Sequence, residues 1–190
     1  MDLKYGVVKL RAMEPEDAPF LVSLLNRSDI EQLVVGRSFS VSKYNEEDWI
    51  KNYNNTEKCL RWIIELNGTL FGTIILNNID WIDRSAEIGI KVNITEPSRI
   101  SGDAKDAYYA VIKYAFTELN LHRITATVLE YNKPSKNIHN IFNFKQEGCL
   151  RKAVFKNNEY HNLMVFGLLK EDFKQYDDGA APWQLKREGY

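Results

Sequence analysis

Two runs of β-forming residues flank the dipeptide Asn67-Gly68, and this arrangement predicts an antiparallel hairpin. The runs cover residues 60–66 and 69–76. Asparagine and glycine both adopt the positive φ angles that a type I′ turn requires at its two central positions. The chain is therefore expected to contain at least one pair of neighbouring antiparallel strands.

Other stretches follow the periodicities of strands and helices. The remaining predicted strands cover residues 7–12, 84–92 and 123–129, and a second hairpin covers residues 149–155 and 160–168, turning at Asn157-Asn158. One predicted helix begins at the proline and acidic residues 14–17. Three more cover residues 46–53, 103–119 and 134–142. The helix at 103–119 has the clearest pattern, because its apolar residues recur with a period of 3.6.

The order of these elements predicts an α+β (mixed α/β) fold. Two hairpins indicate a central, mostly antiparallel sheet of about seven strands flanked by helices, and the strand–helix connections of the second half indicate some parallel pairing. Residues 1–173 are expected to form a single domain, followed by a C-terminal tail at 174–190 that is either loose or docked. A chain of 190 residues is long enough for one domain with a substantial core.

Composition and charge exclude several classes of function. The net charge of -1 argues against nucleic acid as a partner, and no apolar run is long enough to span a membrane. No N-terminal signal peptide is recognisable. Cys59 and Cys149 lie far apart, as expected of reduced thiols in a cytoplasmic protein. The three histidines have no partners at metal-ligand spacing, so no metal is expected.

A strand, a loop and a helix start follow one another between residues 84 and 105, and this segment is suited to binding a phosphate. The first turn of a helix offers unpaired N–H groups and the positive end of the helix dipole. Gly102 lets the backbone approach a ligand closely, and Arg99 adds positive charge. These residues equally allow an ordinary strand-to-helix turn, in which Gly102 adopts a positive φ angle and Arg99 is solvated.

The same segment carries a family resemblance. Residues 99–104, Arg-Ile-Ser-Gly-Asp-Ala, fit the pattern [Q/R]-x-x-G-x-[G/A] of GNAT N-acetyltransferases. Residues 115–124, Ala-Phe-Thr-Glu-Leu-Asn-Leu-His-Arg-Ile, resemble the RimJ/RimL-like branch of that superfamily, as do residues 10–17, 84–90 and 147–151. The resemblance covers about residues 7–173. It implies acetyl-CoA as co-substrate, held between two splayed strands, and direct attack on the thioester by a primary amine.

The resemblance also implies which residues contact acetyl-CoA. The backbone of Ile90, Lys91 and Val92 pairs with the pantetheine arm, and Asn132 matches an asparagine that contacts the cofactor in relatives. The implied pyrophosphate site consists of Arg99, Ile100, Ser101, Gly102, Asp103 and Ala104. A backbone N–H of the strand at 84–92 is expected to stabilise the oxyanion. Asp103 and Glu96 add negative charge there, which Lys105 and Arg99 offset.

Two residues are candidates for acid–base catalysis. Glu87 matches the acid that serves as general base in many relatives, although it can instead pair with Lys91 or Arg84. His139 occupies the position at which the family has the tyrosine that protonates the leaving thiolate. The alternative is that His139 is an ordinary helix residue and that the thiolate leaves unaided. Asn143 replaces the family's glycine and tolerates the same left-handed backbone.

The acceptor amine is not defined by the sequence. A small amine, a polyamine, an amino sugar and a protein N-terminus all remain open, and the polar, irregular residues 26–55 are expected to form much of the acceptor site. A homodimer is a further expectation, since some members of the family form dimers. The alternative function is a non-catalytic module that binds CoA or a partner protein.

Overall fold

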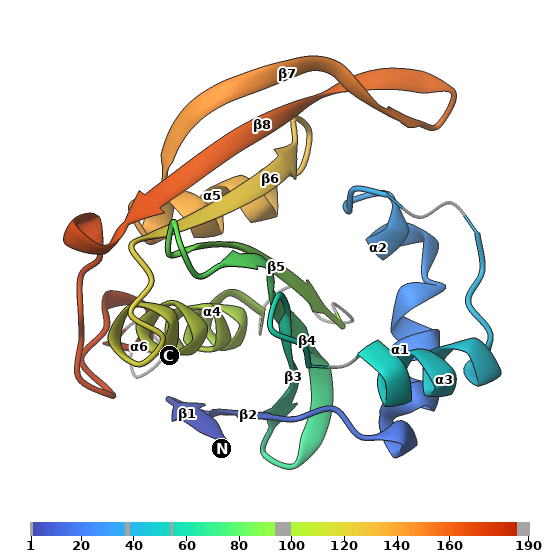
Figure 1. Cartoon of the computed structure of the whole chain (residues 1–190), viewed down its shortest axis with the longest axis horizontal. Helices are drawn as coiled ribbons and strands as arrows, with labels where there is room; N and C mark the ends of the chain where they lie inside the picture. Colours follow the sequence, from blue (N-terminus) through green and yellow to red (C-terminus); the bar gives the residue numbers. More distant parts are fainter. Residues whose placement is uncertain (1, 37–38, 54, 94–99, 186–190) are drawn as a thin grey trace.

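The fold is built on one mixed sheet of eight strands (Figure 1). The computed structural model describes residues 2–36, 39–53, 55–93 and 100–185. The strands are β1 (Leu3–Tyr5), β2 (Val8–Arg11), β3 (Leu60–Leu66), β4 (Thr69–Asp80), β5 (Ser85–Val92), β6 (Arg123–Leu129), β7 (Lys145–Lys156) and β8 (Glu159–Leu169). The helices are α1 (Ala18–Leu25), α2 (Ser28–Glu31), α3 (Lys43–Tyr53), α4 (Ile100–Thr117), α5 (Lys133–Ile141) and α6 (Pro182–Leu185). The predicted mixed α/β class, with a mostly antiparallel sheet, is confirmed.

Some predictions about individual elements were incomplete. The strand predicted at 7–12 is β2, and β1 before it was not predicted; Gly6, with a φ of +58°, turns the chain between the two strands, so the described sheet has eight strands where about seven were expected. The region 26–55, expected to be irregular, contains α2, and α3 begins earlier than expected, at Lys43. Helix α4 begins at Ile100 rather than residue 103, so Gly102 lies in its first turn. A long packed helix tolerates the cost of about 1 kcal/mol that one glycine imposes.

Both predicted hairpin turns are present. Asn67 and Gly68 have φ angles of +50° and +80°, and Leu66 pairs with Thr69. Asn157 and Asn158 have φ angles of +50° and +63° between β7 and β8. Residues that readily adopt a positive φ angle therefore lie where the chain reverses.

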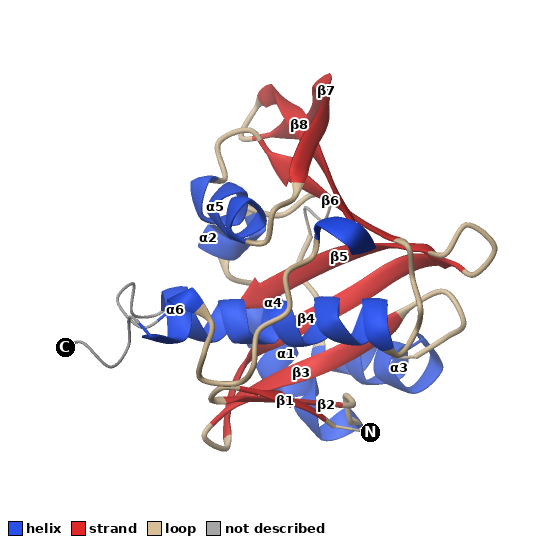
Figure 2. Ribbon diagram, turned by 90° about the vertical axis from the view of Figure 1, so that its left-hand side faces the viewer, coloured by secondary structure: helices blue, strands red, loops and turns tan. Residues whose placement is uncertain are grey.

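Helices cover both faces of the first five strands (Figure 2). Helix α4 packs its buried residues, such as Tyr108 and Ile112, into the main core with Ile74 and Leu76 of β4. On the opposite face α1 and α3 form a smaller core around Leu21, Ile50 and Ile63.

The sheet is split between β5 and β6. These two strands pair in parallel only from Ser85↔Arg123 to Glu87↔Thr125. Beyond Thr125, β6 continues its pairing with β8 on its other side, as far as Leu129↔Leu163. The described sheet thus consists of a first wing, β1 to β5, and a second wing, β6 to β8, joined at a short stretch of backbone (Figure 1).

The last described residues are docked rather than loose. The indole of Trp183 is buried and donates a hydrogen bond of 2.8 Å to Asp106 Oδ1 on α4. The Tyr109 hydroxyl donates to the carbonyl of Tyr176 at 2.9 Å. The amide of Gly6 donates to Asp178 Oδ1 at 2.8 Å, so the first hairpin and the end of the chain meet beside α4.

The crowding at Gly6 yields a test of this arrangement. A Cβ atom on Gly6 would lie 2.0 Å from Asp106 Oδ2, whereas a Cβ on Gly68 would meet no atom within 4 Å. Alanine at either site costs about 1 kcal/mol for its positive φ. We expect Gly6→Ala to lose about 1–3 kcal/mol more than Gly68→Ala, because the buried Asp106 must move. Urea unfolding measures both variants, and equal losses would contradict the close packing.

Candidate active site

A cavity of about 970 Å³ opens where the two wings separate. Its floor is formed by β5 and by the neighbouring strands β3 and β4, and its walls come from α1, α2, α3, α4 and α5. The polar and charged residues in the lining include Glu46, Arg61, Asn77, Glu87, Lys91, Lys105, Thr127, Asn132 and His139. The cavity therefore combines a largely apolar enclosure with a small number of groups able to bind or move protons.

One edge of β5 faces this cavity. Ile90, Lys91 and Val92 all line it, and on the other side Ile90 and Val92 pair with Ile74 and Gly72 of β4. In the described part of the chain, β5 has no strand partner on its β6 side after Glu87. Alternate N–H and C=O groups of this edge can thus pair with an extended ligand, as a further strand would.

The beginning of α4 borders the same cavity. Ala104 and Lys105 line it, and Lys91 of β5 brings a second positive charge. Asp103 is buried and lies outside the lining. Of the other residues expected at a pyrophosphate, Ile100, Ser101 and Gly102 form the first turn of α4, and Arg99 lies outside the described residues.

Glu87 stands at the point where β5 and β6 part. Its Oε1 accepts a hydrogen bond of 2.8 Å from Thr127 Oγ1, and its Oε2 accepts one of 3.2 Å from Asn78 Nδ2. The side chain is half-buried and lines the cavity. Two neutral donors on different strands therefore orient this carboxylate while leaving it able to take up a proton.

His139 forms a neutral pair with Tyr108. Its Nδ1 lies 2.5 Å from the carbonyl of Ser135, which can only accept, so Nδ1 carries the proton. Its Nε2 then accepts from the Tyr108 hydroxyl at 2.8 Å. Burial lowers the pKa of His139 to about 4, and burial together with the charge of Glu87 raises the pKa of Tyr108 well above its usual value. Both groups are uncharged at neutral pH.

Asn132 joins α5 to the opposite wall. Its Oδ1 accepts from the amide of Ser135 at 3.0 Å, which caps α5, and its Nδ2 donates to the carbonyl of Leu33 at 2.9 Å. Asn132 lines the cavity, but both ends of its amide are used within the protein. A contact between Asn132 and the cofactor stays a prediction.

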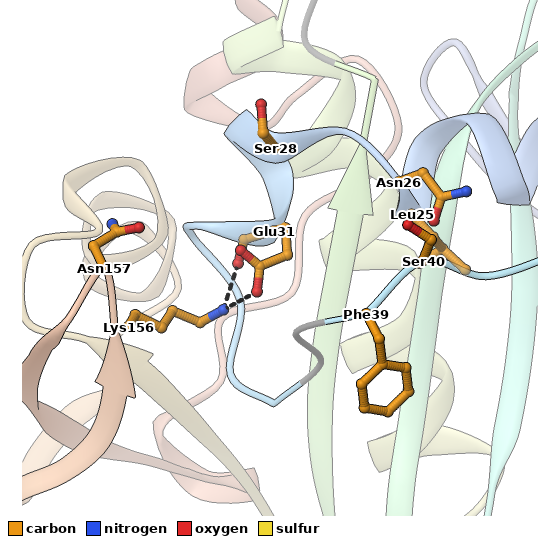
Figure 3. A pocket seen from close by; sticks show the side chains of 8 residues that line it. All are labelled: Leu25, Asn26, Ser28, Glu31, Phe39, Ser40, Lys156 and Asn157. Atoms are coloured by element: carbon orange, nitrogen blue, oxygen red, sulfur yellow. Dashed lines mark hydrogen bonds and ion pairs between the residues drawn. The ribbon is translucent and has the colours of Figure 1, made fainter.

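Residues 28–33, the α2 bridge, connect the first wing to the second. The Tyr131 hydroxyl donates to the carbonyl of Gln32 at 2.7 Å. Lys156 Nζ donates to the carbonyl of Glu31 at 2.8 Å and forms an ion pair with its carboxylate (Figure 3). Lys156 is almost fully buried there, with 3% of its side chain exposed. The bridge closes one side of the large cavity and borders a second hollow of about 400 Å³ (Figure 3).

Two further structural findings concern membranes and metals. None of the described helices is long and apolar enough to cross a bilayer. Within the described residues, no group of three or more histidine, cysteine, aspartate or glutamate side chains could hold a metal ion.

Comparison with known proteins identifies relatives over most of the chain. A family model described as "Acetyltransferase (GNAT) domain" matches residues 8–145. An uncharacterized prophage-derived N-acetyltransferase of Bacillus subtilis, YokL, is 28% identical over 87% of this chain and 91% of its own length. The putative ribosomal N-acetyltransferase YdaF of the same organism is 29% identical, covering 88% of this chain and 93% of its own length.

A solved structure also matches closely. The spermidine N-acetyltransferase of Vibrio cholerae, in complex with CoA and spermine, superposes with a TM-score of 0.81 and 26% identity. The match covers 87% of this chain and 97% of the Vibrio cholerae chain.

Burial of His139 predicts a loss of stability in mild acid. Histidine titrates near pH 6.5 when unfolded, and the folded state holds the pKa of His139 at about 4. The contribution of its neutral form is complete above pH 6.5 and is lost as the pH falls towards 4, a difference of about 3 kcal/mol. We expect His139→Gln to flatten the pH dependence of unfolding in this window. The exposed His122→Gln should keep the wild-type slope, and an unchanged slope in His139→Gln would contradict the assignment.

The ion pair of the α2 bridge predicts unequal costs. Lys156→Met removes a buried cation with two acceptors and should lose about 2–3 kcal/mol, since it leaves both acceptors unpaired. Glu31→Gln keeps the bond from Lys156 to the backbone carbonyl and should lose about 1 kcal/mol. The double variant, measured by urea unfolding, should show coupling of about 1 kcal/mol. Additive losses would mean that the two side chains do not interact.

Proposed function

The chain belongs to the GNAT acetyltransferase family and is an N-acetyltransferase that moves the acetyl group of acetyl-CoA to a primary amine; we propose that transfer takes place in the cavity between the wings, with Glu87 as general base. The observation that carries this proposal is the position of the Glu87 carboxylate. It lines the cavity beside the free edge of β5, at the point of divergence from β6.

The residues present fit acetyl-CoA. The stretch Ile90, Lys91 and Val92, which has no strand partner on the β6 side among the described residues, suits the amide-bearing pantetheine arm, which can pair with it as a strand. The first turns of α4 offer N–H groups and a positive dipole to the pyrophosphate, and Lys105 adds charge. Arg99, Ile100, Ser101, Gly102, Asp103, Ala104 and Asn132 complete the proposed set of contacts.

Glu87 solves the main difficulty of the reaction. Acetyl-CoA supplies the acetyl group as a thioester, but a primary amine is mostly protonated at neutral pH and has no lone pair for attack. Glu87 takes the surplus proton, directly or through a water molecule, while Thr127 and Asn78 hold the carboxylate in place. A backbone N–H of β5 stabilises the negative charge that develops on the carbonyl oxygen.

The site favours departure of the thiolate without a proton from His139. A donor must carry its proton on the nitrogen facing the thiolate, but His139 Nε2 accepts from Tyr108 and Nδ1 donates to Ser135. His139 is therefore proposed as a positioning residue that fixes α5 against α4 rather than as the acid expected from its place in the sequence.

Location and assembly belong to the proposal as well. Cys59 and Cys149 are both free thiols, which supports a reducing compartment such as the cytoplasm. A homodimer remains a proposal that the mass in solution, measured by light scattering, decides.

Replacement of Glu87 tests the function. We expect Glu87→Gln to lower kcat/KM for amines by about 10²–10⁴-fold at neutral pH, with partial recovery as the pH approaches the pKa of the amine. Free CoA thiol reports turnover. The increase in melting temperature caused by acetyl-CoA should persist, because the cofactor contacts remain.

The exposed Glu118→Gln, in the turn just after α4, serves as the control and should keep wild-type turnover. Wild-type rates in Glu87→Gln would remove Glu87 from the reaction.

A further inference from the structure

Where α3 and β3 line the cavity, an arginine side chain lies against an aromatic ring. Arg61 of β3 lines the cavity, and its Cζ lies 4.4 Å from the centroid of the Trp49 ring on α3. Burial lowers the pKa of Arg61, and the nearby charge of Glu46 opposes this effect. Arginine stays charged in such a setting, and its attraction for an anion or a carbonyl oxygen grows as water is excluded.

Sheet pairing places Arg61 and Glu87 on one face. Arg61 pairs with Ile75, and Ile75 pairs with Gly89. Glu87 precedes Gly89 by two residues and therefore points to the same side of the sheet. From the spacing of strands and residues, the Cα atoms of Arg61 and Glu87 are about 12 Å apart. Two long side chains that converge from this separation can contact one small acceptor molecule.

We propose that Arg61 binds a carbonyl or carboxylate oxygen of the acceptor, and that the acceptor is an amino acid derivative or a peptide N-terminus with an apolar first side chain. This inference rests on the proposed function, in which Glu87 receives the proton of the acceptor amine. It names the class of amine that the same cavity accepts.

The guanidinium has the geometry for this task. Its planar set of N–H donors binds a carboxylate or a peptide carbonyl with defined direction. Stacking on Trp49 fixes the plane, so little conformational freedom is lost on binding. The charge of Glu46, in the first turn of α3, acts on Arg61 and favours its charged form.

The cavity that Arg61 lines also has apolar walls, which suit an apolar side chain. They include Met13, Leu21, Leu25, Ile30 and Leu33. A polyamine bound at Glu87 would have to place its second ammonium group against apolar side chains, near the guanidinium or at Glu46. The first position removes a charge from water and the second brings like charges together, whereas at Glu46 the ammonium group would compete with the charge of Arg61.

Paired acceptors that differ only by a carboxamide group test the inference. Leucinamide and 3-methylbutylamine share one side chain, and only leucinamide offers a carbonyl oxygen. We expect Arg61→Gln to raise the KM for leucinamide by about tenfold or more, as for loss of a charged hydrogen bond, and to change the KM for 3-methylbutylamine less than about twofold. The ratio of the two effects is compared, since it cancels the different basicities of the amines.

Three further measurements make the result specific. Arg61→Lys keeps the charge without the planar donors and should recover only part of the affinity for leucinamide. The exposed Arg151→Gln on β7 is the matched control and should leave both KM values unchanged. Melting temperatures of all variants separate a lost contact from a damaged fold.

The outcomes distinguish the two proposals. If Arg61→Gln affects both amines equally, or if the wild type acetylates spermidine in preference to leucinamide and a leucine-initiated tripeptide, the acceptor assignment is overturned. The role of Glu87 is then still decided by whether Glu87→Gln loses turnover on the amine that the protein accepts. Failure of Glu87→Gln to slow any acceptor overturns the proposed function, whatever the result for Arg61.

Discussion

The short parallel pairing between β5 and β6 is the constraint on which the rest of the structure depends. Three register pairs join the wings, after which each strand keeps its partner on the outer side only. Splitting a sheet exposes two rows of backbone polar groups, and such an edge is stable only where water or a ligand can satisfy it. The split thus creates the cavity, and in the proposed function the pantetheine arm of acetyl-CoA pairs with the edge of β5 that borders it.

Neutral and charged contacts both hold the wings together beside the split. Neutral hydrogen bonds from Asn132 and Tyr131 and the ion pair of Lys156 and Glu31 connect them on one side, and the pair of Tyr108 and His139 ties α5 to α4. Charged groups such as Glu87 and Arg61 face the cavity. The neutral hydrogen bonds do not change with pH near neutrality, and in the proposed function it is Glu87 that takes up the proton of the amine.

Sequence patterns located the elements that obey local rules. The hairpins followed from residues that tolerate positive φ, and α4 followed from its apolar period. The family pattern predicted that β5 and the start of α4 contact the cofactor, and both border the cavity. Strand β1 was missed because three residues carry too little alternation, and α2 because a single turn has no periodicity.

Contacts between distant residues had no local signal. Lys156 and Glu31 are 125 residues apart, and each looks like an ordinary surface charge in the sequence. The positions of Tyr108 and Arg61 likewise depend on strand register and helix packing. The sequence left His139 open as a proton donor or as an ordinary helix residue, because its tautomer is set by its contacts with Ser135 and Tyr108 in the folded structure. Protonation is a property of the assembled site, which residue type alone does not fix.

The docking of the chain's end beside Gly6 has a consequence for how the protein folds. The bonds from Tyr5 and Gly6 to Asp177 and Asp178 span 172 residues, almost the whole length of the chain. Contacts of such long sequence separation are slow to form, because the intervening chain must first lose its freedom. On a ribosome the first hairpin emerges long before Asp178 and Trp183 do, so its native environment is incomplete until those residues have been synthesised. The first strand of the sheet is therefore among the last to be secured.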